Sequence, residues 1–480
     1  MFKKILTVIL FFSALLSFSQ ELVNYTPVEL KRNRDVFQIV DNNKKETTLF
    51  ISDKEKVKAI LLNEKMQITD SISTERPDKK VYTDMIGYNT NNSNVRLYWS
   101  SSNHKQIFSQ LYDFRNRKIS INQYTLPFKD EVYLQKFSSK DKFYILSVIK
   151  ESSIFKLYIF DQDGKYDTKS IDLNTLRFYK KDYTKTSLYG VLEENFLPFE
   201  SPFSIQNIIT ENPSSIADGA KKRKCYFNEK EIIITLDTNV DYTQILTINL
   251  DSYTIREKVI QKPIIVTQNR SNLNSNSFYF DNKLYQIKSS PDSFAFTIKN
   301  LEGELLKEFN VTPDTPIDFK NSDIYQEDSD FGGKRILENS SQFIRKVNNL
   351  YSGISCYHIG ENTLVTLGSV SELKQSTGQI ALGQFGLVGA IAASAIYYNP
   401  TMQSFNSYAN RKVVKIECLF DKDNNHIKEE LKPLAFDKIR TFFDENTDVS
   451  SQTLYKLDSN YYLGYYDNKT KEYIIRKFFD

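Results

Sequence analysis

Few side chains of this chain have the types and spacing that chemistry needs. The sequence contains three histidines and three cysteines, which are His104, His358, His426, Cys225, Cys356 and Cys418. The histidines stand singly and the cysteines form no C-x-x-C pair, so neither a zinc site nor histidine-based catalysis is indicated. Each cysteine lies in a segment of alternating apolar residues, which predicts a buried thiol in a strand. We therefore name no catalytic residue, no metal site and no cofactor.

Two charged clusters are better explained as loops than as sites. Asp421, Asp423 and Asn425 begin like a calcium loop, but His426 stands at the sixth position, where the sharp turn needs glycine. A hairpin turn is therefore predicted there. The densest basic run extends from Lys221 to Lys224, and it is expected to be a solvated loop before a strand.

The elements that would position any site belong to a recurring hairpin unit. In each copy, a strand of alternating apolar residues ends in Asp or Asn, and a short polar turn leads into a second strand. The anchor residues are Asn63, Asp113, Asp161, Asp251, Asn300, Asp421 and Asp467. The intervals between them are 50, 48, 90, 49, 121 and 46 residues, and four of the six match the length of a four-stranded propeller blade.

An upstream strand precedes most of these hairpins and completes the core of each blade. The upstream strands are expected at 47–52, 95–100, 143–149, 231–237, 283–289 and 362–368. The fold class is therefore all-β, a β-propeller of seven four-stranded blades. The interval of 90 residues leaves room for an eighth blade around 180–224. Two β-sandwich domains split near 200–225 are the alternative, which the regular interval disfavours.

The first residues have the pattern of a secretory signal. Lys3 and Lys4 precede an apolar run over 5–16, and Ser17-Phe18-Ser19 supplies the small residues of a cleavage site. We expect a signal peptide over 1–19 and a single propeller domain over 20–480, exported to the periplasm, the cell surface or the medium.

One segment, 375–410, contains no charged residue in 36 positions. Its apolar part, 380–398, is nearly long enough to span a bilayer. A single span would place the strands at 362–368 and 413–420 on opposite sides of the membrane, so their pairing in one blade would exclude it. Two interpretations stay open: a hairpin that contacts a partner or a membrane surface, and a hairpin folded back on the propeller. The predicted contact residues are Leu382, Phe385, Leu387, Val388, Ile391, Ile396, Tyr397 and Tyr398.

The cleavage-site residues 17–20, the turn anchors and the uncharged insertion together resemble uncharacterised exported propeller-like proteins of gliding, polymer-degrading bacteria. This resemblance covers most of the chain. It implies a propeller fold and an exported location, and it implies no activity.

The balance of charge limits the class of partner. The chain has 63 basic and 60 acidic residues, so a nucleic-acid partner is not expected. The predicted function is a non-enzymatic binding or scaffolding propeller, with the insertion 375–410 contacting an unknown protein, an envelope component or a membrane surface. The alternative is a carbohydrate-active propeller enzyme with carboxylates gathered at the channel mouth.

Overall fold

The apolar patterns of the sequence form β-strands throughout the computed structural model, which describes residues 20–26, 35–53, 55–91, 94–267, 270–328, 333–371, 399–409 and 413–480. Strands in the middle of a sheet are buried on both faces. In β11 (Phe143–Ile149), the first six of the seven residues are buried. Strands at an outer edge, such as β9 (Lys118–Thr125), alternate between exposed and partly buried residues. The position of a strand in its sheet therefore determines which of its residues are buried.

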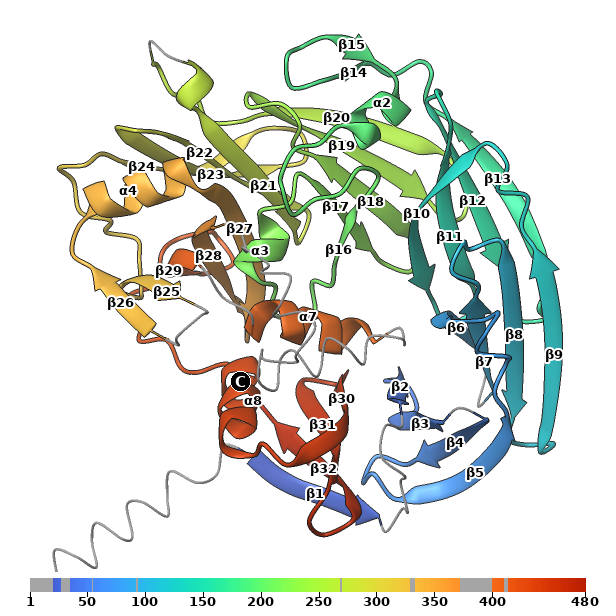
Figure 1. Ribbon diagram of the computed structural model, residues 1–480. Helices are drawn as coiled ribbons and strands as arrows, with labels where there is room; N and C mark the ends of the chain where they lie inside the picture. The colour runs from blue at the N-terminus through green and yellow to red at the C-terminus, as the bar shows by residue number, and fades with distance from the viewer. Residues whose placement is uncertain are drawn as a thin grey trace, which may run out of the picture.

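Seven sheets of four or five strands make up the described chain, and we number them as blades 1 to 7 (Figure 1). Blade 1 consists of β2 (Asp35–Asp41), β3 (Glu46–Ser52), β4 (Lys56–Leu62) and β5 (Ile68–Glu75). Blade 2 consists of β6 (Asp84–Asn91), β7 (Asn94–Ser100), β8 (Gln106–Asp113) and β9. Blade 3 consists of β10 (Glu131–Ser138), β11, β12 (Ile154–Phe160) and β13 (Tyr166–Asp172).

Among the later blades, blades 4 and 6 have a fifth strand in addition to the four of the other blades. Blade 4 consists of β16 (Gln206–Ile208), β17 (Arg223–Phe227), β18 (Glu231–Leu236), β19 (Tyr242–Asn249) and β20 (Ile255–Gln261), and β16 is parallel to β17. Blade 5 consists of β21 (Asn274–Phe280), β22 (Lys283–Ser290), β23 (Ser293–Asn300) and β24 (Leu305–Val311). Blade 6 consists of β25 (Ile324–Asp328), β26 (Gly333–Leu337), β27 (Tyr351–Ile359), β28 (Asn362–Val370) and β29 (Val413–Phe420). Blade 7 consists of β30 (Val449–Leu457), β31 (Asn460–Asp467), β32 (Glu472–Phe478) and β1 (Gln20–Thr26).

The blades are arranged as a ring, and each packs its face against the next through aromatic side chains (Figure 1). The contacts between successive blades include Phe50 with Tyr112, Tyr98 with Phe143, Phe137 with Phe227, Tyr226 with Phe278, Phe296 with Phe420, Tyr357 with Tyr461, and Tyr455 with Met66. Because the last of these joins blade 7 to blade 1, the ring is closed. The structure is a seven-bladed β-propeller, as the sequence predicts.

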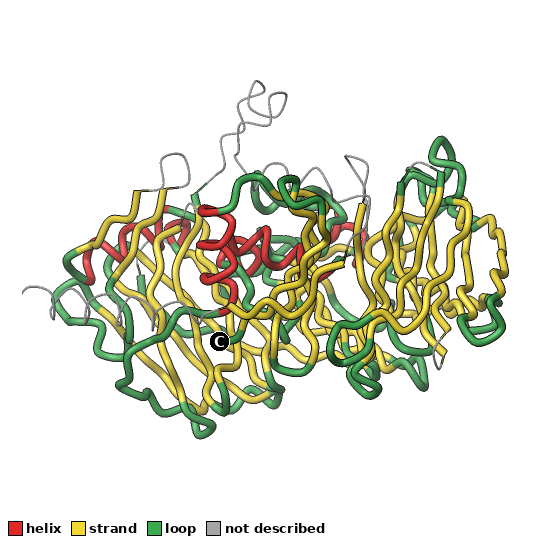
Figure 2. Tube along the Cα trace, turned by 90° about the horizontal axis from the view of Figure 1, so that it is seen from below, coloured by secondary structure: helices red, strands yellow, loops and turns green. Residues whose placement is uncertain are grey.

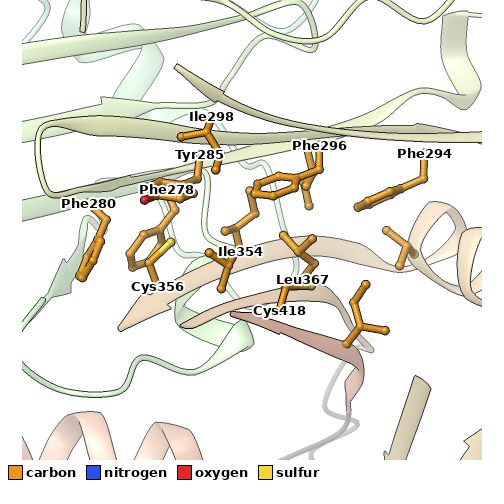
Figure 3. Packing of buried hydrophobic residues seen from close by; sticks show 14 of the residues in the cluster. Phe278, Phe280, Tyr285, Phe294, Phe296, Ile298, Ile354, Cys356, Leu367 and Cys418 are labelled. Atoms are coloured by element: carbon orange, nitrogen blue, oxygen red, sulfur yellow. The ribbon is translucent and has the colours of Figure 1, made fainter. Parts of the chain in front are cut away.

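Figure 3 shows one of these interfaces, where blade 5 meets blade 6. Phe278 and Phe296 lie opposite Ile354 and Leu367, and all four side chains are fully buried. Large aromatic side chains of this kind supply most of the buried apolar area between two twisted sheets.

The anchor residues close the turns between strands with their own side chains. The Asn63 side-chain oxygen accepts hydrogen bonds from the backbone N–H groups of Lys65 and Gln67. The carboxylate of Asp161 accepts one from the N–H of Lys165 at 2.8 Å. Such side-chain turns explain why the repeat requires Asp or Asn. In blade 4 this role belongs to Asn249 rather than to the predicted Asp251, because Asn249 accepts from the N–H groups of Asp251 and Ser252.

The structure decides between seven and eight blades, and it corrects one predicted hairpin. The long interval holds no eighth blade: residues 178–219 form the two-stranded pair β14 (Phe178–Tyr179) and β15 (Lys185–Thr186), helices α2 (Leu188–Glu193) and α3 (Ile216–Gly219), and the extra strand β16. The turn at Asp421 does form, but only a single bridge from Phe420 to His426 follows it. The edge of β29 where the predicted second strand of the hairpin would pair is occupied by the earlier strand β25.

Helices occupy the middle of the ring and its rim. Helix α7 (Pro400–Ala409) lies against β30, α3 and α8 (Ala435–Glu445), while α4 (Ser340–Asn349) packs on blades 5 and 6 (Figure 1). A short 3-10 helix, η1 (Arg270–Asn272), precedes blade 5. Seen from below, the helices lie among the strands toward one face of the ring (Figure 2). No helix in the described segments is long and apolar enough to cross a membrane.

Candidate functional site

The insertion begins and ends at two adjacent strands of blade 6. β28 and β29 pair antiparallel over their full lengths, from Thr363 with Phe420 to Val370 with Val413. The predicted pairing of 362–368 with 413–420 is therefore confirmed. The predicted signal peptide, 1–19, and all eight predicted contact residues, which lie between 382 and 398, are outside the described residues.

The last part of the insertion folds back into the ring as α7. Met402 and Phe405 are buried, and the Phe405 ring lies 5.4 Å from Phe436 and 5.8 Å from Phe443 of α8. Residues 400–409 therefore belong to the core, and the predicted contact element must be confined to the part of 375–410 that precedes them.

The residue before this helix joins the two blades that flank the closure of the ring. The Asn399 side chain donates to Gln38 on β2 and to the hydroxyl of Thr453 on β30, at 3.2 and 2.9 Å. Its side-chain oxygen also accepts from the N–H of Met402, which starts the helix. Because Asn399, Gln38 and Thr453 are all buried, this network fixes the position of α7 relative to blades 1 and 7.

Helix α3 supports α7 from the opposite side. Gly219 of α3 lies directly on β27, because a Cβ atom at Gly219 would be only 2.0 Å from the carbonyl oxygen of Ile354. The hydroxyls of Ser215 and Ser407 are 2.6 Å apart, which links the two helices. Burial raises the pKa of the Asp218 carboxyl to about 6, although the Ser407 hydroxyl and Lys221 act to lower it.

A small polar cavity of about 30 Å³ lies beside these two helices, against blade 6. It is bordered by Ser215, Tyr408, Lys415 and Glu417, and Lys415 forms an ion pair with Glu417 at 2.6 Å. Its volume is enough for about one water molecule. The centre of the ring is therefore closely packed at this point, with α7 hydrogen-bonded to α3.

The basic run at Lys221 to Lys224 is not a solvated loop, which corrects the prediction. Arg223 and Lys224 begin strand β17, and their side chains are completely buried. Arg223 forms an ion pair with the equally buried Glu200 at 2.9 Å. Glu200 also accepts the backbone N–H groups of Lys222 and Arg223, so every charge at this position has a partner close by.

Lys224 and Lys262 share one buried carboxylate, that of Asp237. The two ammonium groups lie 3.1 and 2.9 Å from its two oxygens, and none of the three side chains is exposed. Asp237 also accepts from the N–H and hydroxyl of Ser277 in blade 5. Burial disfavours the charged carboxylate, but the attraction of Lys262 and Lys224 outweighs it and holds the pKa of Asp237 well below its usual range. The cluster therefore joins blade 4 to blade 5.

Lys222 lies beside these two cations with a carbonyl, that of Ser275, as its acceptor at 2.6 Å. Burial and repulsion by Lys262 lower the pKa of the Lys222 ammonium to about 7, while Asp237 acts in the opposite direction. A lysine in such a position changes its charge near neutral pH. Sequence reasoning missed this cluster because its members come from four separate segments.

Of the three histidines, His358 is exposed near the end of β27, His426 is partly buried beside Asn321, and His104 has a structural position. The ring of His104 stacks on that of Tyr133 at 4.1 Å, and burial lowers its pKa, assisted by Lys136. His104 Nδ1 lies 3.3 Å from the hydroxyl of Ser100, which has the form of a nucleophile and base. Ser100 is fully buried, however, and its hydroxyl donates to the carbonyl of Ser101 at 2.8 Å. The pair closes a turn rather than facing a substrate.

The other predicted positions agree with the structure where it describes them. All three cysteines are free and buried in strands, as predicted. The Asp421 carboxylate accepts from the N–H groups of Asp423 and Asn425, which makes the predicted turn. Within the described segments, no group of three or more His, Cys, Asp or Glu side chains is placed to hold a metal ion.

Comparisons with known proteins add the following. No protein-family model matches the chain, and no curated protein does. Among solved structures, the chain is similar to an inactive virginiamycin B lyase from Staphylococcus aureus, with 10% identity over 94% of this chain and 98% of that one, at a TM-score of 0.30. A neuraminidase-like protein of A/little yellow-shouldered bat is 10% identical over 73% of this chain and 95% of its own, at a TM-score of 0.26.

A third similar structure is cobalt-substituted apocarotenoid oxygenase from Synechocystis, with 7% identity and a TM-score of 0.28. The match covers 59% of this chain and spans about 62% of the length of the oxygenase. The assignment of this chain as a propeller rests on its own strand pairings and on the closure of the ring.

Proposed function

We propose that this chain is an exported, non-enzymatic binding or scaffolding propeller whose uncharged insertion contacts a partner protein or a membrane surface. The contact residues would be Leu382, Phe385, Leu387, Val388, Ile391, Ile396, Tyr397 and Tyr398. The observation that carries the proposal is the way in which the insertion is attached. One end leaves β28, and the other returns through α7 to the neighbouring strand β29.

This attachment suits a contact element for two reasons. A segment held at both ends by a rigid core loses less conformational entropy when it binds than a free tail would. The segment 375–398 also combines nine large hydrophobic side chains with no charge, which is the composition of the centre of a protein interface.

The test replaces residues 375–398 with glycine and serine at equal length, so that Asn399 and α7 stay in place. A deletion that continued through Ser407 would remove buried Phe405 and would confuse contact with folding. The replaced protein is expected to keep its thermal midpoint within about 2 °C. A photo-crosslinker at position 387 of the native sequence is expected to capture one specific protein, or the protein is expected to float with phosphatidylethanolamine–phosphatidylglycerol vesicles.

Point variants distinguish a specific contact from nonspecific hydrophobic binding. Phe385→Ser combined with Val388→Ser should abolish the crosslink from position 387 or the flotation, whereas Ser394→Ala should leave it unchanged. Absence of both crosslinking and flotation for the native chain would refute the proposal, and so would their survival in the glycine–serine replacement. A vesicle result without a crosslink would assign the membrane surface as the partner.

A further inference from the structure

A groove of about 380 Å³ opens along the outer strands of blade 4. One wall consists of Tyr242 and Gln244 on β19 with Glu257 and Val259 on β20. Gln244 is opposite Val259 in the strand pairing, so these alternate residues share one face of the sheet. The other wall is the segment 175–179, which leads from blade 3 into β14 and contributes Tyr179.

The two walls are tied together. The Gln244 amide donates to the carbonyl of Arg177 at 3.1 Å and to the Glu257 carboxylate. Beyond the groove, the Tyr183 hydroxyl donates to Asp241, which also accepts from Lys288 at 2.9 Å. The β14–β15 hairpin is therefore held against blade 4, and the groove exists before any ligand arrives.

The side chains in the groove alternate between apolar surface and hydrogen-bonding groups. Val259 is 57% exposed although it is apolar, and Tyr179 and Tyr242 are partly buried beside it. Burial raises the pKa of Tyr242, with further contributions from Tyr179 and nearby acidic groups, so its phenol stays protonated at neutral pH. Its hydroxyl is thus available to a ligand as a donor.

The charges of the groove balance. Arg177 contributes one positive charge and Glu257 one negative charge, so the groove favours a ligand without net charge. Tyrosine rings and valine methyls suit the apolar faces of a sugar ring, while a carboxylate and a guanidinium suit its hydroxyls. We propose that this groove binds a short neutral saccharide. Its volume lies at the lower end of the range of roughly 300–1,000 Å³ for small-molecule sites.

The experiment measures binding of neutral trisaccharides, namely maltotriose, cellotriose, xylotriose and mannotriose, to the full chain by saturation-transfer NMR and calorimetry. We expect at least one of them to bind. Val259→Trp should weaken that binding at least about tenfold because the indole fills the groove. Glu257→Gln should weaken it about threefold to tenfold, because the charge-assisted hydrogen bond is lost while the shape is kept.

The matched control is Ile121→Trp, which places the same ring at a site 53% exposed on β9 of blade 2. It should leave binding unchanged. Absence of binding for all four sugars at about 10 mM, equal binding by Val259→Trp, or preference for trigalacturonate over every neutral probe would overturn the proposal. The glycine–serine replacement of 375–398 should not alter saccharide binding, so this test is independent of the proposed function.

Discussion

At the residue scale, the unusual feature of this protein is its set of buried cations. Lys224 and Lys262 are both fully buried against the single carboxylate of Asp237, with Lys222 next to them. The excess positive charge is tolerated because each buried ammonium has three close acceptors. Lys222 has the carbonyl of Ser275 as its acceptor, and burial together with repulsion by Lys262 lowers its pKa to about 7.

The lowered pKa predicts that stability depends on pH. Between about pH 7 and 10.5 the unfolded chain holds a proton on Lys222 that the folded protein has released, so the free energy of unfolding contributed by this group rises with pH. Below about pH 7 Lys222 is charged in both states, so the folded protein bears the full free-energy cost of burying that charge. Lys222→Met should therefore raise the free energy of unfolding at pH 7 by about 1–3 kcal/mol and should have no such effect at pH 10.5.

Urea unfolding at a series of pH values measures this difference between the protein and its variant. The control is Lys118→Met, because Lys118 is exposed on β9. This substitution should cause the same small change in stability at every pH. A loss of stability in Lys222→Met that is the same at pH 7 and pH 10 would contradict the prediction.

At the element scale, α7 is the helix that fills the ring between blades 1, 6 and 7. Its buried side chains join the hydrophobic cluster of α8 and blade 7, and the cap residue Asn399 joins blades 1 and 7. The helix is ten residues long and would be marginal in isolation, so its stability comes from packing. An element of this kind can hold a contact segment in place.

Phe405→Ala should lower the free energy of unfolding by about 3–5 kcal/mol, because it leaves a cavity among the rings of Phe436 and Phe443. Gln403→Ala, on the exposed side of the same helix, should change it by less than about 0.5 kcal/mol. Chemical denaturation measures both variants. A loss below about 1 kcal/mol for Phe405→Ala would mean that α7 is not part of the core.

At the scale of the whole molecule, the ring is closed by strands from both ends of the described chain. β1 pairs antiparallel with β32 from Gln20 with Phe478 to Thr26 with Tyr473, and it forms the outer edge of blade 7. Leu22 and Tyr25 of β1 are 52% and 60% exposed, so these two side chains contribute little beside the backbone pairing. Val23 packs against the core between blades 7 and 1, and the Asn24 side chain donates to the carbonyl of Met66. Without it, the edge of β32 would be free to pair with another chain.

A chain that starts at residue 27 should therefore be less stable than one that starts at residue 20. The lost backbone hydrogen bonds are worth roughly 3–6 kcal/mol in total. The shortened chain should also associate with itself as its concentration rises. Thermal unfolding and size-exclusion chromatography measure the two effects. Leu22→Thr combined with Tyr25→Thr keeps the backbone and should behave as the parent protein, and a comparable loss in this double variant would contradict the backbone explanation.

The amino-acid sequence by itself determined the strands, their grouping into seven blades and the pairing of 362–368 with 413–420. The strands and turns are local properties, since alternation of apolar residues and an Asx turn act within a dozen neighbouring positions. The pairing of 362–368 with 413–420 followed instead from the repeat of one strand arrangement in successive blades. The burial of Cys225, Cys356 and Cys418 followed from the same alternation.

Only the tertiary structure decided which distant segments meet. β1 joins the last blade, and β25 takes the place expected for a strand after Asp421. A strand pattern states that a segment will pair, but it does not state with which partner, because backbone hydrogen bonds are alike in every blade. Lys224 was predicted to be solvated for a related reason. Its burial depends on Asp237 and Asn276, 13 and 52 positions away, which the pairing of β17 with β18 and the packing of blade 5 on blade 4 bring within hydrogen-bond distance.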